Sequence, residues 1–250
     1  MENTLKAMLE TTDVAYGAWL SLPDNISTEL VAHTGFDYTC IDMQHGLIDY
    51  QSTVNKLQIL GLAPTVPIVR VPTLEVNIIC KALDAGAMAI IVPLVNNAEE
   101  AQAAVSASRY PPQGHRSMGP KRPMTLSGLE YLKEANQSIS VIPMIETADG
   151  LKNIDEIVKI DGIDAVYVGP FDLHLGLGLE PGFDSDEPLF NDALKRIVES
   201  CHNAGIAAAV HSTSQLAAKR REQGFDMITV APDINLLKQS LRDALKMAKQ

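Results

Sequence analysis

The sequence predicts a (β/α)8 barrel, the α/β fold in which eight parallel strands alternate with helices. Eight short apolar runs rich in branched residues recur along the 250 residues, and a segment with helical periodicity follows each of them. Neither a GxGxxG turn nor a Walker motif is present, which disfavours an open, doubly wound sheet. We therefore expect residues 1–250 to form a single TIM-barrel domain.

The predicted strands are short and almost wholly apolar, as parallel strands that are covered on both faces are. They cover Tyr16–Leu22, Tyr38–Met43, Val66–Val71, Ala89–Val95, Val141–Glu146, Ala165–Gly169, Ala207–His211 and Met227–Val230.

The predicted helices begin after cap residues such as Asp24, Ser214 and Asp233. Several end before a glycine that we expect to be left-handed: Gly35, Gly61, Gly86, Gly205 and Gly224. The helical segments are Asn25–Thr34, Gln51–Leu60, Glu75–Ala85, Asn97–Ser108, Leu151–Val158, Leu189–Ala204, Ser214–Gln223 and Ile234–Lys249.

One connection, Arg109–Gln137, is too long for a simple turn and is predicted to be a large loop. No acidic residue occurs between positions 101 and 129, whereas four basic residues do: Arg109, Arg116, Lys121 and Arg122. Two interpretations remain open. The segment is either a solvated surface loop or a basic lip that attracts a carboxylate substrate to the barrel mouth or meets an acidic neighbouring subunit.

Composition limits the partners. With 20 Lys and Arg against 31 Asp and Glu, the net charge of −11 disfavours nucleic acid and anionic membranes as partners. No apolar run has the ~18–20 residues of a membrane span, and the first residues lack an export signal, so we expect a cytoplasmic protein. Cys40, Cys80 and Cys201 are widely spaced and are expected to be buried thiols.

Chemistry in this fold belongs at the carboxyl ends of the strands, and polar residues interrupt the apolar pattern there. Glu146 and Asp172 end or follow neighbouring strands. Two converging carboxylates either share a proton or bind a hard divalent cation, and we favour Mg²⁺ or Mn²⁺. The alternative is capping, with Asp172 at the short turn Leu173–Leu177 and Glu146 at the helix after Thr147.

Arg70 lies within an apolar strand, where an unpaired guanidinium is costly, so we expect it to bind an anion. The alternative is a salt bridge with Asp42 or Glu146. His45 follows a strand and is a candidate general base, with Asp42 or Asp84 fixing its tautomer, although a loop histidine is often only a surface residue.

Phe171 and His211 are candidates for contacts with substrate. No lysine lies within or directly after a predicted strand, which disfavours a Schiff-base mechanism. No GxSxG motif is present, which weakens hydrolase interpretations.

Six ordered motifs together resemble the HpcH/HpaI family of class II, metal-dependent pyruvate aldolases. They are Asp42–Gly46, Pro67–Pro72, Leu83–Ala87, Arg109–Arg116, Pro143–Thr147 and Gly169–Leu173.

The resemblance implies a barrel whose last helix is exchanged between subunits of a hexamer, a trimer of dimers. It also implies metal ligation by Glu146 and Asp172, pyruvate binding by Arg70, and a base formed by His45 with Asp84 of an adjacent subunit. Two positions depart from relatives: Gln44, often Glu, and Met144, Gln in some aldolases. Gln44 is nevertheless expected beside the substrate.

The implied reaction is reversible aldol cleavage of a 4-hydroxy-2-oxo acid to pyruvate and an aldehyde through a metal-stabilised enolate, as in 4-hydroxy-2-oxoheptanedioate and 2-keto-3-deoxy-sugar-acid aldolases. The expected cofactor is Mg²⁺, Mn²⁺ or Co²⁺, with no organic cofactor. Alternatives are an oxaloacetate decarboxylase or a CoA-thioester lyase with the same enolate and, more remotely, a non-catalytic metabolite-binding barrel.

Overall fold

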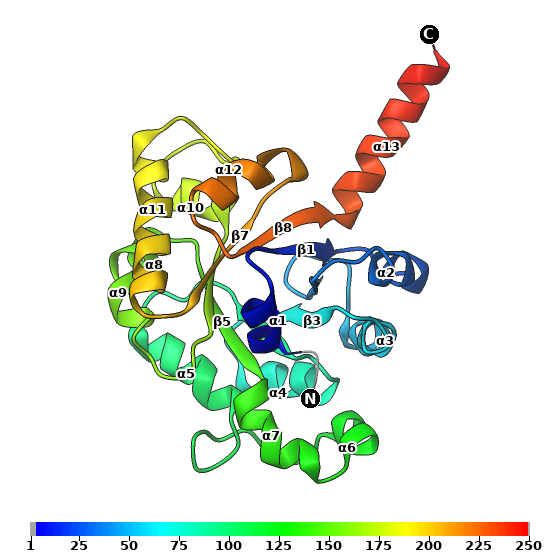
Figure 1. Cartoon of the computed structure of the whole chain (residues 1–250), viewed down its shortest axis with the longest axis vertical. Helices are drawn as coiled ribbons and strands as arrows, with labels where there is room; N and C mark the ends of the chain where they lie inside the picture. The colour runs from blue at the N-terminus through cyan, green and yellow to red at the C-terminus, as the bar shows by residue number, and fades with distance from the viewer. Residues whose placement is uncertain (1–3, 250) are drawn as a thin grey trace.

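The computed structural model describes residues 4–249, in which eight parallel strands close into a barrel in sequence order (Figure 1). The fold class and all eight predicted strands are confirmed, with bounds that shift by a few residues. The strands are β1 (Ala15–Leu20), β2 (Tyr38–Asp42), β3 (Val66–Arg70), β4 (Ala89–Val92), β5 (Ser140–Ile145), β6 (Ala165–Val168), β7 (Ala207–His211) and β8 (Met227–Pro232).

The helices follow the predicted alternation, with four additions: α1, α6, α7 and α10. Two predicted helices are divided, one into α8 and α9 and the other into η1 and α12. The helices are α1 (Leu5–Thr11), α2 (Asn25–Ala32), α3 (Tyr50–Leu60), α4 (Val76–Asp84), α5 (Ala98–Ser108), α6 (Lys121–Ser127), α7 (Glu130–Ser138), α8 (Ala148–Lys152), α9 (Ile154–Ile157), α10 (Pro170–Gly176), α11 (Pro188–Asn203), the 3-10 turn η1 (Ser214–Leu216), α12 (Ala217–Glu222) and α13 (Asp233–Ala248).

Four of the five glycines predicted to be left-handed are so. Gly35, Gly86, Gly205 and Gly224 have positive φ angles. The prediction for Gly61 is wrong, because its φ of −67° is right-handed.

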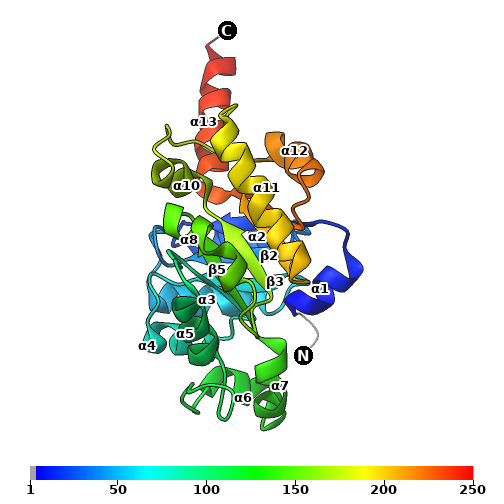
Figure 2. The ribbon, with the colours of Figure 1, turned by 90° about the vertical axis from the view of Figure 1, so that its left-hand side faces the viewer.

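The prediction of one large loop over Arg109–Gln137 is wrong, and so is the interpretation as a basic lip at the barrel mouth. Contact with an acidic neighbouring subunit stays a prediction. The connection contains α6 and α7, which lie at the end of the molecule away from α13 (Figure 2). Arg122 donates to the carbonyl oxygens of Leu57 and Ala85, which lie near the ends of helices that lead into the amino ends of β3 and β4. Arg109 and Arg116 are buried and face Asp carboxylates, so their charges are neutralised inside the protein.

Strand alternation divides the apolar side chains into two layers. Cys40, Ile68 and Tyr167 belong to the cluster inside the barrel, whereas Ile41 and Val69 belong to the cluster between barrel and helices. The inner cluster includes Leu5 of α1, next to residues that begin the strands, so α1 closes the amino end of the barrel. The interior of the barrel is therefore reached from the carboxyl end, where TIM-barrel enzymes have their active sites.

Helix α13 projects away from the barrel in both views (Figures 1 and 2). Its first residue, Asp233, is buried, and its carboxylate accepts hydrogen bonds from the backbone of Ser21 and Leu22 after β1. Leu237 and Leu241, one turn apart, are 50% and 63% exposed. This geometry leaves an apolar helix face uncovered by the chain itself.

Two smaller expectations concern membranes and cysteines. Within residues 4–249, none of the helices combines the length and apolar character that crossing a bilayer requires. Cys40, Cys80 and Cys201 are free thiols; Cys40 and Cys201 are buried, as predicted, and Cys80 is partly exposed.

Candidate active site

A cavity of about 220 Å³ opens at the carboxyl ends of the strands. It brings together seven of the nine predicted site residues: Asp42, His45, Arg70, Glu146, Phe171, Asp172 and His211. The remaining lining residues are Trp19, Ser21, Met144, Gly169, Pro170, Pro232, Ile234 and Asn235. Gln44 and Asp84 do not line it.

Alternation along each strand explains why these groups converge. Asp42 follows Tyr38 and Cys40 at two-residue spacing, and both of those side chains point into the barrel. Glu146 follows Ile142 and Met144 in the same way. The polar residues therefore form the last inward layer, at the open end.

Asp42 and Arg70 form a two-pronged ion pair at this layer. The two residues are register partners on β2 and β3. Arg70 Nε lies 2.9 Å from Asp42 Oδ1, and Nη2 lies 2.6 Å from Oδ2. Burial opposes ionisation of Asp42, but the hydrogen bonds and charge of Arg70 prevail, so the pKa of Asp42 is lowered. The structure therefore contains the salt bridge between Arg70 and Asp42 that the sequence left open as an alternative to anion binding.

Pairing with Asp42 does not use all the donors of Arg70. Nη1 has no hydrogen-bond partner among residues 4–249, and the side chain lines the cavity. A guanidinium that is fixed on one side and open on the other can bind an anionic ligand without moving.

Asp42 also orders the turn that carries His45. Its Oδ1 accepts the backbone N–H groups of Gln44, at 3.0 Å, and His45, at 3.2 Å. The imidazole of His45 is exposed in the cavity and makes no hydrogen bond to Asp42 or Asp84 in the described chain. Gln44 Oε1 is buried and has no hydrogen-bond partner among the described residues, and Gln44 is not one of the residues that line the cavity.

Glu146 does not cap a helix. Its Oε1 accepts the N–H of Leu94 at 2.9 Å, and Thr147 caps α8 instead. Leu94 has a φ of 55°, an uncommon conformation for a residue with a branched side chain. Asp172 lies inside the first turn of α10, whose N-cap is Gly169, so Asp172 is not a cap either. Both capping alternatives are wrong.

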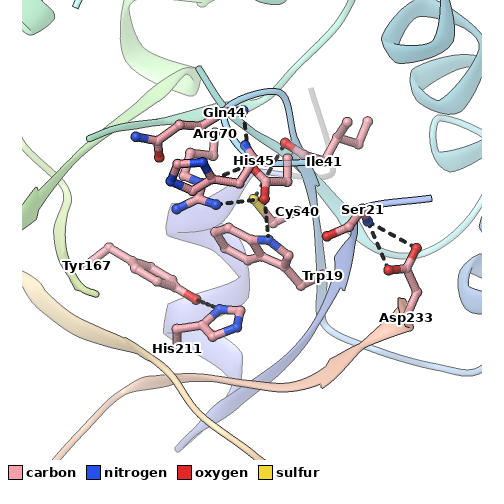
Figure 3. Close-up of polar contacts among 11 residues, drawn as sticks. Trp19, Ser21, Cys40, Ile41, Gln44, His45, Arg70, Tyr167, His211 and Asp233 are labelled. Carbon is pink, nitrogen blue, oxygen red and sulfur yellow. Dashed lines mark hydrogen bonds and ion pairs between the residues drawn. The ribbon is translucent and has the colours of Figure 1, made fainter. Parts of the chain in front are cut away.

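Gly169 leaves room for the second carboxylate oxygen of Glu146, Oε2. A Cβ at this position would overlap Glu146 Oε2, so the carboxylate packs directly against bare backbone. Sequence reasoning did not single out Gly169 for this role, and the glycine directly after β6 was the available signal. Trp19 was missed too, although its Nε1 donates to Asp42 Oδ2 at 3.2 Å (Figure 3).

The electrostatics around Glu146 favour a cation. The pKa of Glu146 is raised to about 7, chiefly by burial and in smaller part by the nearby charge of Asp172, against the opposing effects of the Leu94 N–H and of Arg70. Asp172 makes no side-chain hydrogen bond to any residue that the structure describes.

Two carboxylates fit a hard divalent cation that takes its other ligands from water and substrate. No group of three or more His, Cys, Asp or Glu side chains within residues 4–249 has the arrangement of a complete metal site.

Asp84 lies at the other end of the barrel. It is the last residue of α4, and its Oδ1 is 2.6 Å from Nη2 of the fully buried Arg116. A position at the end of a helix that leads into β4 is at the amino end of the strands, so Asp84 does not reach the cavity of its own chain.

The closed barrel has a buried arginine and carboxylates with shifted pKa values at its carboxyl end, where TIM-barrel enzymes have their active sites. These features define the chain as a TIM-barrel enzyme. Residues 15–240 match the family described as HpcH/HpaI aldolase/citrate lyase. The chain belongs to this family.

Two relatives and one solved structure show the extent of the similarity. The hydroxypyruvate/pyruvate aldolase of Rhizorhabdus wittichii is 39% identical, over 94% of both chains. The 4-hydroxy-2-oxo-heptane-1,7-dioate aldolase of Escherichia coli is 35% identical, over 95% of this chain and 91% of the relative. An HpcH/HpaI aldolase/citrate lyase family protein from Burkholderia cenocepacia has a TM-score of 0.91 at 33% identity, covering 98% and 99% of the two chains. The chain is thus a carbon–carbon lyase of a type that performs aldol cleavage.

Replacing Glu146 with Gln is expected to remove a pH dependence of stability. The folded state holds a proton up to about pH 7, whereas the unfolded carboxyl, with its ordinary pKa of 4.5, loses it earlier. Stability from this group is therefore full below about pH 4.5 and is lost as the pH rises through about 7. In EDTA, the free energy of unfolding of the wild type should fall by roughly 3 kcal/mol more between pH 5 and 8 than that of Glu146→Gln.

Denaturant titrations at equal protein concentration measure this difference. Parallel pH profiles for the two proteins would contradict the assignment of the raised pKa to Glu146.

Proposed function

We propose that the chain catalyses reversible aldol cleavage of a 4-hydroxy-2-oxo acid to pyruvate and an aldehyde, with Mg²⁺, Mn²⁺ or Co²⁺ as cofactor. One observation carries the proposal. A buried carboxylate with a pKa raised to about 7, Glu146, lies beside a second carboxylate and close to an arginine with open donors. The relatives add support, since pyruvate aldolases are among them.

Glu146 and Asp172 would hold the cation. When bound, a divalent ion polarises the 2-oxo group and accepts part of the negative charge that develops as the carbon–carbon bond breaks. Two protein carboxylates leave several coordination positions for a 2-oxo acid and water, which agrees with a site that must bind and release substrate.

Arg70 would bind the 2-oxo acid and its enolate. The enolate forms when the electron pair of the C3–C4 bond moves to C3, and charge grows on the oxygen at C2. The guanidinium is held rigidly by Asp42, so its open N–H groups need little reorganisation to meet that charge.

His45 is the general base in this proposal. It is the exposed imidazole of the cavity, and it would take the proton of the C4 hydroxyl as C4 becomes the aldehyde carbon. Protonation of C3 then gives pyruvate. Because Asp84 does not reach the cavity of its own chain, we propose that Asp84 of an adjacent subunit assists His45.

Removal of divalent ions tests the reaction class. Protein stripped with EDTA should form no aldol product from pyruvate and a panel of aldehydes, and added Mg²⁺, Mn²⁺ or Co²⁺ should restore turnover. Product analysis with oxaloacetate and acyl-CoA substrates separates decarboxylase and thioester-lyase activities. Full turnover by protein shown to be metal-free would exclude the proposed cofactor, and pyruvate binding without turnover would favour a binding protein.

Replacing Arg70 with Ala is expected to lower kcat by at least ~100-fold, as loss of an oxyanion donor does. Arg196→Ala is the matched control, because Arg196 is an exposed arginine paired with Asp155 outside the cavity. Circular dichroism confirms that both variants fold. A kcat for Arg70→Ala within a few-fold of the control would remove Arg70 from the reaction.

We further propose that α13 packs on a second copy of this chain in a hexamer built as a trimer of dimers. Its leucines are exposed at one-turn spacing, and burying a leucine contributes roughly 1.5–3 kcal/mol. Leu241→Lys should therefore reduce the mass measured by light scattering, whereas Gln239→Lys, on another face of the helix, should not. An unchanged mass for Leu241→Lys would contradict this packing.

A further inference from the structure

His211 presents its ring to the cavity between two aromatic side chains. Its centroid lies 4.8 Å from that of Trp19 in an edge contact and 5.8 Å from that of Phe183 in a near-parallel one. Its Nδ1 lies 3.3 Å from the hydroxyl of Tyr167 (Figure 3). These three contacts fix the plane and the position of the imidazole.

Tyr167 is one member of a chain of hydroxyl groups inside the barrel. Tyr167 and Tyr38 each contact Thr229 Oγ1, at 2.5 and 2.9 Å. All three residues are fully buried. Their hydroxyl groups form no other side-chain hydrogen bonds within residues 4–249, so the chain runs from Tyr38 through Thr229 and Tyr167 to His211.

Only one direction of donation uses every hydroxyl hydrogen of this chain. Tyr38 donates to Thr229, Thr229 to Tyr167, and Tyr167 to Nδ1 of His211. If Nδ1 donated instead, the hydrogen of Tyr38 or of Thr229 would be buried without an acceptor, which costs roughly 1–3 kcal/mol. The hydrogen of the neutral imidazole is therefore on Nε2.

The imidazole is also uncharged at neutral pH. The pKa of His211 is lowered to about 4, chiefly by burial and also by the positive charge of Arg70, against a smaller effect of Asp42. Nε2–H has no acceptor among the described residues, and the side chain lines the cavity. The chain thus offers a fixed, neutral donor for which residues 4–249 supply no acceptor.

We propose that Nε2–H of His211 binds a neutral oxygen on the aldehyde partner and makes the enzyme prefer aldehydes with a hydroxyl group on the carbon next to the carbonyl. The inference rests on the proposed aldol reaction and specifies its substrate class. Apart from the histidines, Arg70 is the one basic side chain among the described residues that line the cavity, and its donors are taken by Asp42 and, in the proposed reaction, by the 2-oxo acid. A second carboxylate on the aldehyde would therefore find no counter-ion there.

Glycolaldehyde and propanal are the matched probes, because they differ by a hydroxyl group in place of a methyl group. The measured quantity is the ratio of kcat/KM for glycolaldehyde to that for propanal, with pyruvate and Mg²⁺. His211→Phe keeps a ring between Trp19 and Phe183 but removes the donor, and it should lower this ratio about tenfold, the effect of one lost hydrogen bond. His211→Gln, which retains an N–H donor, should recover part of the preference.

Tyr167→Phe tests the positioning role of the hydroxyl chain. Without the donor to Nδ1, the imidazole hydrogen is no longer confined to Nε2, so the ratio should fall by a few-fold. General damage to the site affects both aldehydes and leaves the ratio unchanged. A His211→Phe ratio within twofold of wild type, or a wild-type preference for succinic semialdehyde over glycolaldehyde, would overturn the inference.

Exchange of the pyruvate methyl protons with D2O, followed by NMR for the wild type with Mg²⁺, separates the two proposals. Exchange needs the enolate but no aldehyde. Its absence would overturn the proposed function and the aldehyde preference that rests on it. Exchange combined with an unchanged His211→Phe ratio would overturn the His211 assignment alone.

Discussion

The ion pair between Asp42 and Arg70 joins the parts of the site. Asp42 bonds the guanidinium twice, and it also holds the indole of Trp19 and the turn with His45. A buried pair is costly to form in water-poor surroundings unless its remaining donors and acceptors are satisfied. Asp42 meets that condition through Trp19 and the backbone, whereas Arg70 keeps donors open toward the cavity. The arginine is therefore rigid and yet available to a ligand.

Charge balance explains the rest of the polar layer. Asp42 neutralises Arg70, which leaves Glu146 and Asp172 without an ion-pair partner among residues 4–249. The fold nevertheless fixes Glu146 tightly, with one oxygen on the N–H of the strained Leu94 and the other against Gly169. Strain at Leu94 and a glycine that admits no side chain are costs to stability. Their common effect is to aim a carboxylate into the cavity.

The sequence predicted the strands well because branched apolar runs between glycines report burial on both faces of a parallel strand. It also predicted which charged residues gather at the open end. Asp42, Arg70 and Glu146 each follow an inward-pointing residue of their strand by two positions, so their side chains point inward too. The sequence did not predict α6 and α7, because the prolines of this connection, such as Pro120 and Pro123, are typical of loops. Arg116 is buried beside Asp84, and a local excess of positive charge does not reveal a partner 32 positions away.

The hydroxyl chain is a second feature that depends on contacts between distant positions and therefore could not be predicted from the sequence. Tyr38, Thr229 and Tyr167 lie on three strands and are ordinary core residues by sequence, so the state of the His211 ring depends on contacts between positions up to 191 apart. This arrangement also separates two tasks. In the two proposals, groups on β2, β3 and β5 act on the 2-oxo acid, while His211 on β7, with the hydroxyl chain behind it, binds the second substrate. A change at position 211 can therefore alter the aldehyde that is accepted without displacing the carboxylates or the arginine that act on the enolate.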